Sequence, residues 1–102
     1  SGLDLLRLAS GELLLAANLT TNARTPLHLA LSEDEGQSWP YRIIVAHDPG
    51  AEFSYPQLLQ DRRGLCHLLY TWRRERIRHL CFDGEWLRRE AAKQAEQLVG
   101  AP

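Results

Sequence analysis

The sequence predicts an all-β chain that ends in a short helix, and three observations support this prediction. Apolar segments of six to eight residues alternate with turn-forming residues over positions 3–82. A polar break at 47–52 (HDPGAE) divides these segments into a group of four and a group of three. After Asp83-Gly84 the apolar spacing becomes that of a helix, which we expect over 85–99.

The first group is expected to form one meander sheet, because its four segments are joined by short turns. Near-continuous apolarity in the second segment suits a strand buried on both faces, and a short helix stays open as an alternative there. The third segment alternates apolar and polar side chains, as a strand does. We expect these four strands at 3–9, 12–19, 26–32 and 41–46, within a unit that spans 1–50.

The second group supplies three strands, at 53–60, 65–72 and 77–82, in a unit that spans 51–83. We expect the alternate residues of the last two strands to face each other across a hairpin. Cys66 and Cys81 lie in these strands and are expected to be buried free thiols, with a cross-strand disulfide as the alternative. The two facing sets are expected to be Cys66, Leu68, Tyr70 and Trp72 on one strand and Ile77, His79 and Cys81 on the other.

The helix is expected to begin after Asp83, whose side chain is a suitable N-cap, within a final unit at 84–102. An apolar stripe at helical spacing should dock on the sheet or on a neighbouring molecule. The stripe consists of Leu87, Ala91, Ala95 and Leu98.

Composition excludes several classes of partner. Apolar residues make up 44% of the chain and charged residues 25%, and the net charge is −1, which gives no general attraction to nucleic acid or membrane. The arginine-rich segment 73–78 is short and is expected to be a solvated hairpin tip. No apolar run approaches the ~20 residues that span a bilayer, and the first residues do not resemble a signal peptide, so no compartment is indicated.

No metal or cofactor is expected. The two cysteines and four histidines have no spacing typical of a metal site. The acidic run Glu33–Glu35 is expected to serve a turn. The histidines, His28, His47, His67 and His79, are expected to be packed or surface residues.

Residues 32–39 (SEDEGQSW) match the Asp-box pattern S-x-D-x-G-x-[ST]-W. Each defined position has a structural task in the turn: Asp34 accepts backbone hydrogen bonds, Gly36 takes a positive φ, Ser38 bonds the carboxylate and Trp39 covers the hairpin base. Ser32 begins the motif. We therefore expect these residues to stabilise a turn and to take no part in chemistry.

Together with other segments, the Asp-box makes the chain resemble the C-terminal part of the bacterial BNR-repeat, sialidase-like family. The resemblance covers about residues 3–87 and implies about two blades of a six-bladed β-propeller, the second with only three strands. The segments that carry it are Arg24–Leu27, Glu52–Pro56, Tyr70–Arg74 and Ile77–His79.

In that family, an arginine triad binds the carboxylate of sialic acid and a tyrosine is the nucleophile. The resemblance places Arg24 at the third arginine of the triad, and a guanidinium suits a carboxylate. It places Phe53 where sialidases have the tyrosine, and Phe53 has no hydroxyl. Tyr55 is on the same face of the strand, but about 6–7 Å further along it. The chain alone is therefore expected to be inactive.

The resemblance implies a C-terminal fragment or truncated member of a sialidase-like glycoside hydrolase that acts on terminal sialic acid or a related acidic sugar. The alternative is a glycan-binding or self-assembling module without chemistry. The expected partners are an acidic glycan, and either further propeller blades or a second copy that pairs with the open sheet edges.

Overall fold

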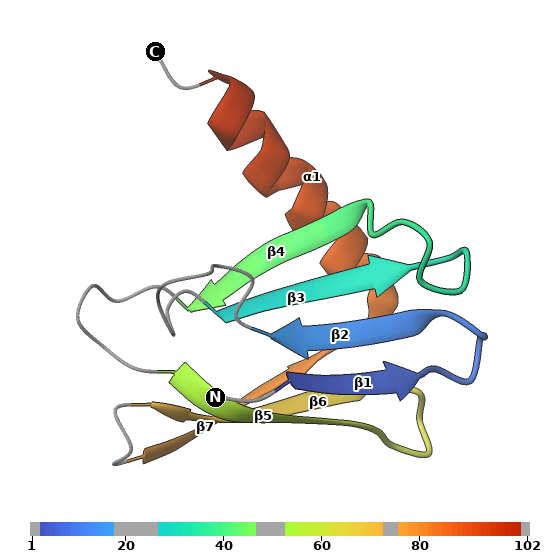
Figure 1. Ribbon diagram of the computed structural model, residues 1–102, viewed down its shortest axis with the longest axis vertical. Helices are drawn as coiled ribbons and strands as arrows, with labels where there is room; N and C mark the ends of the chain where they lie inside the picture. Colours follow the sequence, from blue (N-terminus) through green and yellow to red (C-terminus); the bar gives the residue numbers. More distant parts are fainter. Residues whose placement is uncertain (1–2, 18–26, 47–52, 73–75, 101–102) are drawn as a thin grey trace.

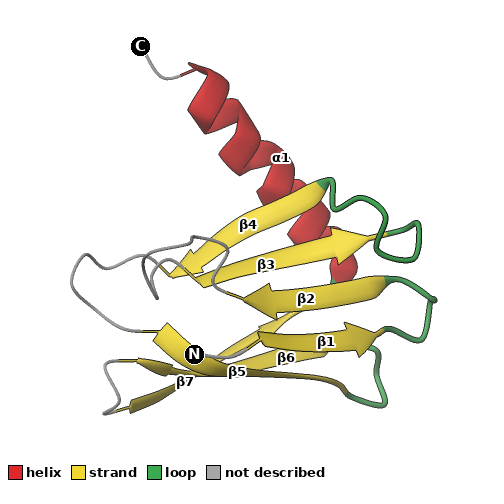
Figure 2. Ribbon diagram, in the orientation of Figure 1, coloured by secondary structure: helices red, strands yellow, loops and turns green. Residues whose placement is uncertain are grey.

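The computed structural model describes residues 3–17, 27–46, 53–72 and 76–100, and it shows two antiparallel sheets and one helix (Figures 1 and 2). The prediction of a mainly β chain with a C-terminal helix is confirmed. The elements are β1 (Leu3–Arg7), β2 (Leu13–Ala17), β3 (Leu27–Ser32), β4 (Tyr41–Ala46), β5 (Phe53–Gln60), β6 (Cys66–Trp72), β7 (Arg76–Phe82) and α1 (Gly84–Gly100).

The first sheet is a four-stranded meander in the order β1-β2-β3-β4. Its register places apolar residues in rows across the strands, since directly paired residues point to the same face. One such row is Leu6, Leu14, Leu31 and Tyr41. Residues 13–17 therefore form a strand, and the helical alternative for this segment is wrong.

The second sheet is a three-stranded meander in the order β5-β6-β7. The register of β5 shifts between Ser54 and Gln57, around Pro56. Proline lacks a backbone N–H and is tolerated at such an irregularity, where no ladder bond is required of it.

The predicted pairing of β6 with β7 is wrong by one residue. Cys66 pairs with Phe82 and Leu68 pairs with Leu80, whereas Cys81 pairs with His67. The reason is the parity of the connection: Trp72 pairs with Arg76, so even-numbered residues of one strand face even-numbered residues of the other. The expectation that Cys81 is buried is therefore wrong, because the register places it on the exposed face; both cysteines are free.

The two sheets bury their inner faces against each other in a common core. The core includes Leu29 of the first sheet, Leu68 of the second and Leu87 of the helix, all 0% exposed. Burying one leucine side chain contributes about 1.5–3 kcal/mol, so this contact is a principal source of stability. The division into units at 1–50, 51–83 and 84–102 stays a prediction, and the core joins residues of all three.

Polar side chains also connect the sheets along β1 and β5, which lie beside each other (Figure 1). Asp4 Oδ2 accepts a hydrogen bond from Leu58 N at 2.7 Å, and Gln60 Oε1 accepts one from Ala9 N at 2.8 Å. These two backbone N–H groups, which would otherwise lack a partner where the sheets meet, thereby have hydrogen-bond acceptors.

The helix α1 crosses from the end of β7 to the far edge of the first sheet (Figure 1). Asp83 is its N-cap, as predicted, because Asp83 Oδ1 accepts a hydrogen bond from Trp86 N at 2.7 Å. Leu87 and Ala91 are buried, but Ala95 is exposed, so the predicted stripe docks only in its first half. Leu98 lies outside the side chains that the structure describes.

Gln94 of α1 occupies the outer edge of β4. Its Oε1 accepts a hydrogen bond from Ile44 N at 2.8 Å, and its Nε2 donates one to Ile44 O at 3.2 Å. The side-chain amide thus makes the two bonds that a fifth strand would make to this residue.

The outer faces of both sheets carry exposed apolar side chains. On the first sheet these include Leu3 and Leu5, which are 67% and 52% exposed; on the second they include Leu59 and Ile77, which are 46% and 73% exposed. Within residues 3–17, 27–46, 53–72 and 76–100, no helix is long and apolar enough to cross a membrane.

Candidate functional site

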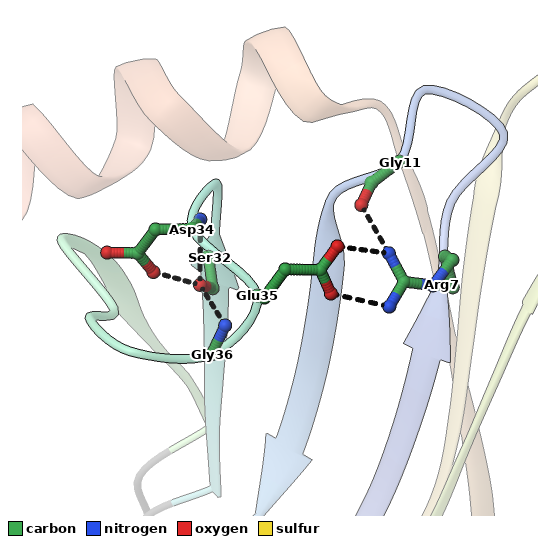
Figure 3. A network of polar contacts seen from close by, with 6 residues as sticks. All are labelled: Arg7, Gly11, Ser32, Asp34, Glu35 and Gly36. Carbon is green, nitrogen blue, oxygen red and sulfur yellow. Dashed lines mark hydrogen bonds and ion pairs between the residues drawn. The ribbon is translucent and has the colours of Figure 1, made fainter.

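The Asp-box forms the turn between β3 and β4, and a hydroxyl and a carboxylate lie at its centre (Figure 3). Ser32, which is fully buried, donates its hydroxyl hydrogen to Asp34 Oδ1 at 2.8 Å and accepts a bond from Gly36 N at 2.9 Å. Asp34 also accepts from Ser38, from its N–H at 2.8 Å and from its hydroxyl at 2.6 Å. These bonds join Ser32, Asp34, Gly36 and Ser38 in one network.

The backbone of the turn passes through two residues with positive φ. Gly36 has a φ of 86°, and a Cβ there would lie 3.6 Å from Trp39 Cζ2, so the tryptophan packs over the glycine. Glu35 has a φ of 63°, which is unusual for a residue with a side chain. The pattern of the motif gives no sign of this second left-handed residue.

Glu35 is held in place by Arg7 of β1 (Figure 3). The guanidinium bonds both carboxylate oxygens, at 3.1 and 2.6 Å, and also Gly11 O at 3.0 Å. A two-point arginine–carboxylate pair has a fixed geometry as well as a favourable energy. It connects the Asp-box turn to the turn between β1 and β2.

A second arginine connects the Asp-box to the helix. Arg88 of α1 bonds Glu12 and, at 3.0 Å, Glu33 of the motif. Its guanidinium also lies 5.4 Å above the centre of the Tyr41 ring, within the range of a cation–π contact. Glu33 and Glu35 of the motif thus bond arginines, whereas Asp34 bonds the serines within the turn.

The carboxylate of Asp34 is a stronger acid than a free aspartate. The hydroxyl of Ser38, then its N–H, then the hydroxyl of Ser32 lower the pKa of Asp34 to about 2. Hydrogen bonds to the charged form favour that form. Arg7 similarly holds the pKa of Glu35 below its usual value through its hydrogen bonds and its charge. The turn is therefore built around ionised carboxylates.

The residues predicted to bind or attack a sugar lie only partly within the described structure. Arg24 lies outside it, in the connection from β2 to β3. Phe53 and Tyr55 lie on β5, but their side chains are outside the described part. The structure places the strand ends that flank them at one end of both sheets, since Leu27 pairs with Ala46 and Phe53 pairs with Trp72 (Figure 1). The Asp-box lies at the opposite end.

A hollow of about 260 Å³ lies between β4, β6, β7 and α1. Tyr70 and Trp86 supply aromatic surface, and Arg78, Glu90 and Gln94 supply polar groups. Glu90 bonds Gln94 at 3.3 Å, and Gln94 bonds the backbone of Ile44, so these polar groups are engaged within the protein.

Three titratable side chains meet on the outer face of the second sheet, which the sequence did not indicate. Asp61 Oδ2 lies 2.8 Å from His67 Nε2, and His67 Nδ1 lies 2.8 Å from His79 Nε2. The histidines are diagonal neighbours on adjacent strands, because His67 pairs directly with Cys81. His67 lowers the pKa of Asp61 through its hydrogen bond. Only the correct register of β6 and β7 would have revealed this cluster.

The cysteines differ in their surroundings. Burial raises the pKa of the Cys66 thiol above its usual value, and Asp83 adds to that effect. A thiol with a raised pKa is a poor nucleophile at neutral pH. Among the described residues, no three histidine, cysteine or acidic side chains are gathered as a ready metal site.

Comparison with known proteins identifies the family but gives no individual relative. The model of the BNR repeat-like domain matches residues 1–68, two thirds of the chain, including the whole Asp-box. No curated protein and no solved structure matches significantly. The Asp-box geometry and this match agree: the chain belongs to the BNR repeat-like family of sialidase-like Asp-box proteins.

Proposed function

We propose that the chain forms two neighbouring blades of a sialidase-like β-propeller and binds an acidic glycan without hydrolysing it. The first part rests on the pairing of two consecutive meanders. Propeller blades are meanders of four antiparallel strands, and the first sheet has this order with an Asp-box between its last two strands. The second sheet, with three strands, packs face to face on the first through a common core, as adjacent blades do.

The glycan proposal is carried by one observation about the topology. The end of β2, the start of β3 and the start of β5 lie at the same end of the two sheets, away from the Asp-box (Figure 1). Arg24 lies between β2 and β3 in the sequence, and its guanidinium would suit a sugar carboxylate, with which it could form two parallel hydrogen bonds. At Phe53, where sialidases have the nucleophilic tyrosine, no hydroxyl is present, so we propose binding without chemistry.

The purified chain is expected to bind a sialylated oligosaccharide and to release no fluorophore from a fluorogenic sialoside. Ligand-observed NMR would measure the binding. Arg24→Ala should weaken it about tenfold or more, since a charge-assisted bidentate contact is lost. Arg42→Ala, which removes an exposed arginine from β4, is the matched control and should leave binding unchanged. Sialoside turnover would contradict the absence of chemistry, and unchanged binding by Arg24→Ala would contradict the site.

Self-association is a second candidate function, and the exposed apolar side chains on both outer faces favour it. Leu5 on the first sheet and Ile77 on the second would be covered if the outer face of one copy met that of another. Sedimentation velocity should then show a mass that rises with concentration, and Ile77→Asp should reduce the association. A chain that stays monomeric at millimolar concentration would contradict this function.

A further inference from the structure

The rings of His67 and His79 lie edge to edge in nearly one plane. Their planes differ by 4°, their centres are 5.1 Å apart, and the nearest nitrogens, Nδ1 of His67 and Nε2 of His79, are 2.8 Å apart. Two ring nitrogens aimed at each other at this distance share one proton. The same arrangement directs two imidazole nitrogens at a single point.

Asp61 fixes one of the two rings. A carboxylate only accepts, so the His67 Nε2 that lies 2.8 Å from Asp61 Oδ2 carries a hydrogen, and in the neutral ring Nδ1 then presents a lone pair to His79. The carboxylate is itself held, because Asp61 Oδ1 accepts bonds from Arg63 N and Leu65 N at 2.9 and 3.0 Å. A histidine oriented by a carboxylate through its other nitrogen is the usual arrangement of a metal-binding histidine.

We propose that His67 Nδ1 and His79 Nε2 bind a divalent transition-metal ion of the zinc class, with Asp61 as the positioning residue. The ion takes the place of the hydrogen between the two nitrogens. That hydrogen moves from Nε2 of His79 to its Nδ1 through water, so both histidines stay neutral and no proton is released. This site is independent of the proposed glycan site, which lies on other residues.

The ion requires the two rings to move relative to each other. Zinc–nitrogen bonds of about 2.0–2.1 Å at a tetrahedral angle separate the two nitrogens by about 3.3–3.4 Å, so the rings must move apart by roughly 0.5 Å. Because the two nitrogens point at each other along one line, the rings must also turn relative to each other by roughly 70° for both lone pairs to meet a tetrahedral ion. His79 is exposed, and its ring can make this movement without disturbing the core. His67 stays held by Asp61, and its side chain is only 21% exposed.

The ligand chemistry selects the class of metal. Imidazole nitrogen suits zinc, copper and nickel, whereas calcium and magnesium require oxygen ligands. Because the described residues supply two ring nitrogens and no third gathered ligand, the remaining positions are open to water or to a ligand from outside. Cys81 pairs with His67 on the same face but is not needed by the two-histidine site.

The test is a titration of the untagged chain with zinc chloride, followed by the ring resonances of its histidines in NMR. One equivalent of zinc should shift the rings of His67 and His79 saturably, and magnesium should shift neither. His79→Gln should weaken zinc binding about tenfold or more, and so should Asp61→Asn through loss of ring orientation. Backbone amide spectra of both variants would establish that they remain folded.

Cys81→Ser is the matched control, because it changes a potential ligand on the same face and should leave zinc binding within about twofold of the original. The proposal is overturned if millimolar zinc leaves both rings unshifted, if folded His79→Gln binds zinc as the original chain does, or if Cys81→Ser abolishes binding. In Asp61→Asn, ring nitrogen shifts should also show a changed tautomer of His67, which a purely structural role of Asp61 would not produce.

Discussion

A Leu29→Ala variant is expected to lose about 2–5 kcal/mol of the free energy of unfolding. Leu29 is fully buried at the centre of the first sheet, where it pairs with Ala16 on one side and Ile43 on the other. Its side chain belongs to the core between the two sheets, so truncation leaves a cavity there that backbone paired on both sides cannot collapse to fill. A domain of this size has only about 5–15 kcal/mol in total.

Urea unfolding followed by fluorescence and by circular dichroism would measure the effect of Leu29→Ala. Leu5→Ala is the matched control, because it removes the same atoms from a residue that is 52% exposed, and it should change stability by no more than about 0.5 kcal/mol. Equal losses in the two variants would show that the inner faces are not the main source of stability.

The second large effect is expected at the start of the helix. Leu87→Ala should also lower the free energy of unfolding by about 2–5 kcal/mol, because Leu87 is fully buried and belongs to the same core as residues of both sheets. The helix turn that it anchors leads into the residues that reach β4. Loss of the anchor should therefore loosen Gln94 and expose the N–H of Ile44, which donates to Gln94 Oε1.

Hydrogen exchange would detect this loosening separately from global unfolding. In Leu87→Ala the amide of Ile44 should exchange faster than the amides of β2, beyond what the change in global stability explains. Arg89→Ala is the control on the same helix; Arg89 is exposed, and its ion pair with Glu85, at 3.6 Å, contributes little. Unchanged exchange at Ile44 in a destabilised Leu87→Ala would show that Gln94 holds the edge without help from the core.

Most of the strands could be predicted because turn-forming residues mark where they begin and end. Residues 41–46 and 53–60 are strands with the predicted bounds. The first strand ends at Arg7, two residues before the expected end, because Leu8 N and Leu8 O already bond Glu12 and Gly11 in the turn. The apolar run continues beyond the residue at which the backbone hydrogen bonds pass from the sheet to the turn. Hydropathy therefore predicts that a strand exists better than it predicts where the strand ends.

The pairing of β6 with β7 could not be predicted with the same security. A one-residue difference in register exchanges the two faces of a strand. The alternation of residues 65–72 and 77–82 is compatible with either register, and only the pairing of Trp72 with Arg76 decides between them. The wrong choice placed Cys81 in the core and separated His79 from His67, so the histidine cluster was missed.

The Asp-box was accessible to sequence reasoning because its contacts are local. Ser32, Asp34, Gly36 and Ser38 bond one another within seven residues. The arginines that support the motif come from far along the chain: Arg7 is 28 residues from Glu35, and Arg88 is 55 residues from Glu33. Such contacts depend on the packing of the whole fold, and no local pattern records them.

The bonds of Gln94 to Ile44 limit how many copies of the chain can join through their strand edges. The edges of β1 and β5 lie beside each other, so β4 and β7 are the outward strands of the described sheets. A molecule with two open strand edges can polymerise without end, as a bifunctional monomer does. With the edge of β4 occupied at Ile44, edge pairing is directed to β7. A molecule with one reactive edge forms closed pairs, so edge-to-edge pairing between copies should end at the dimer.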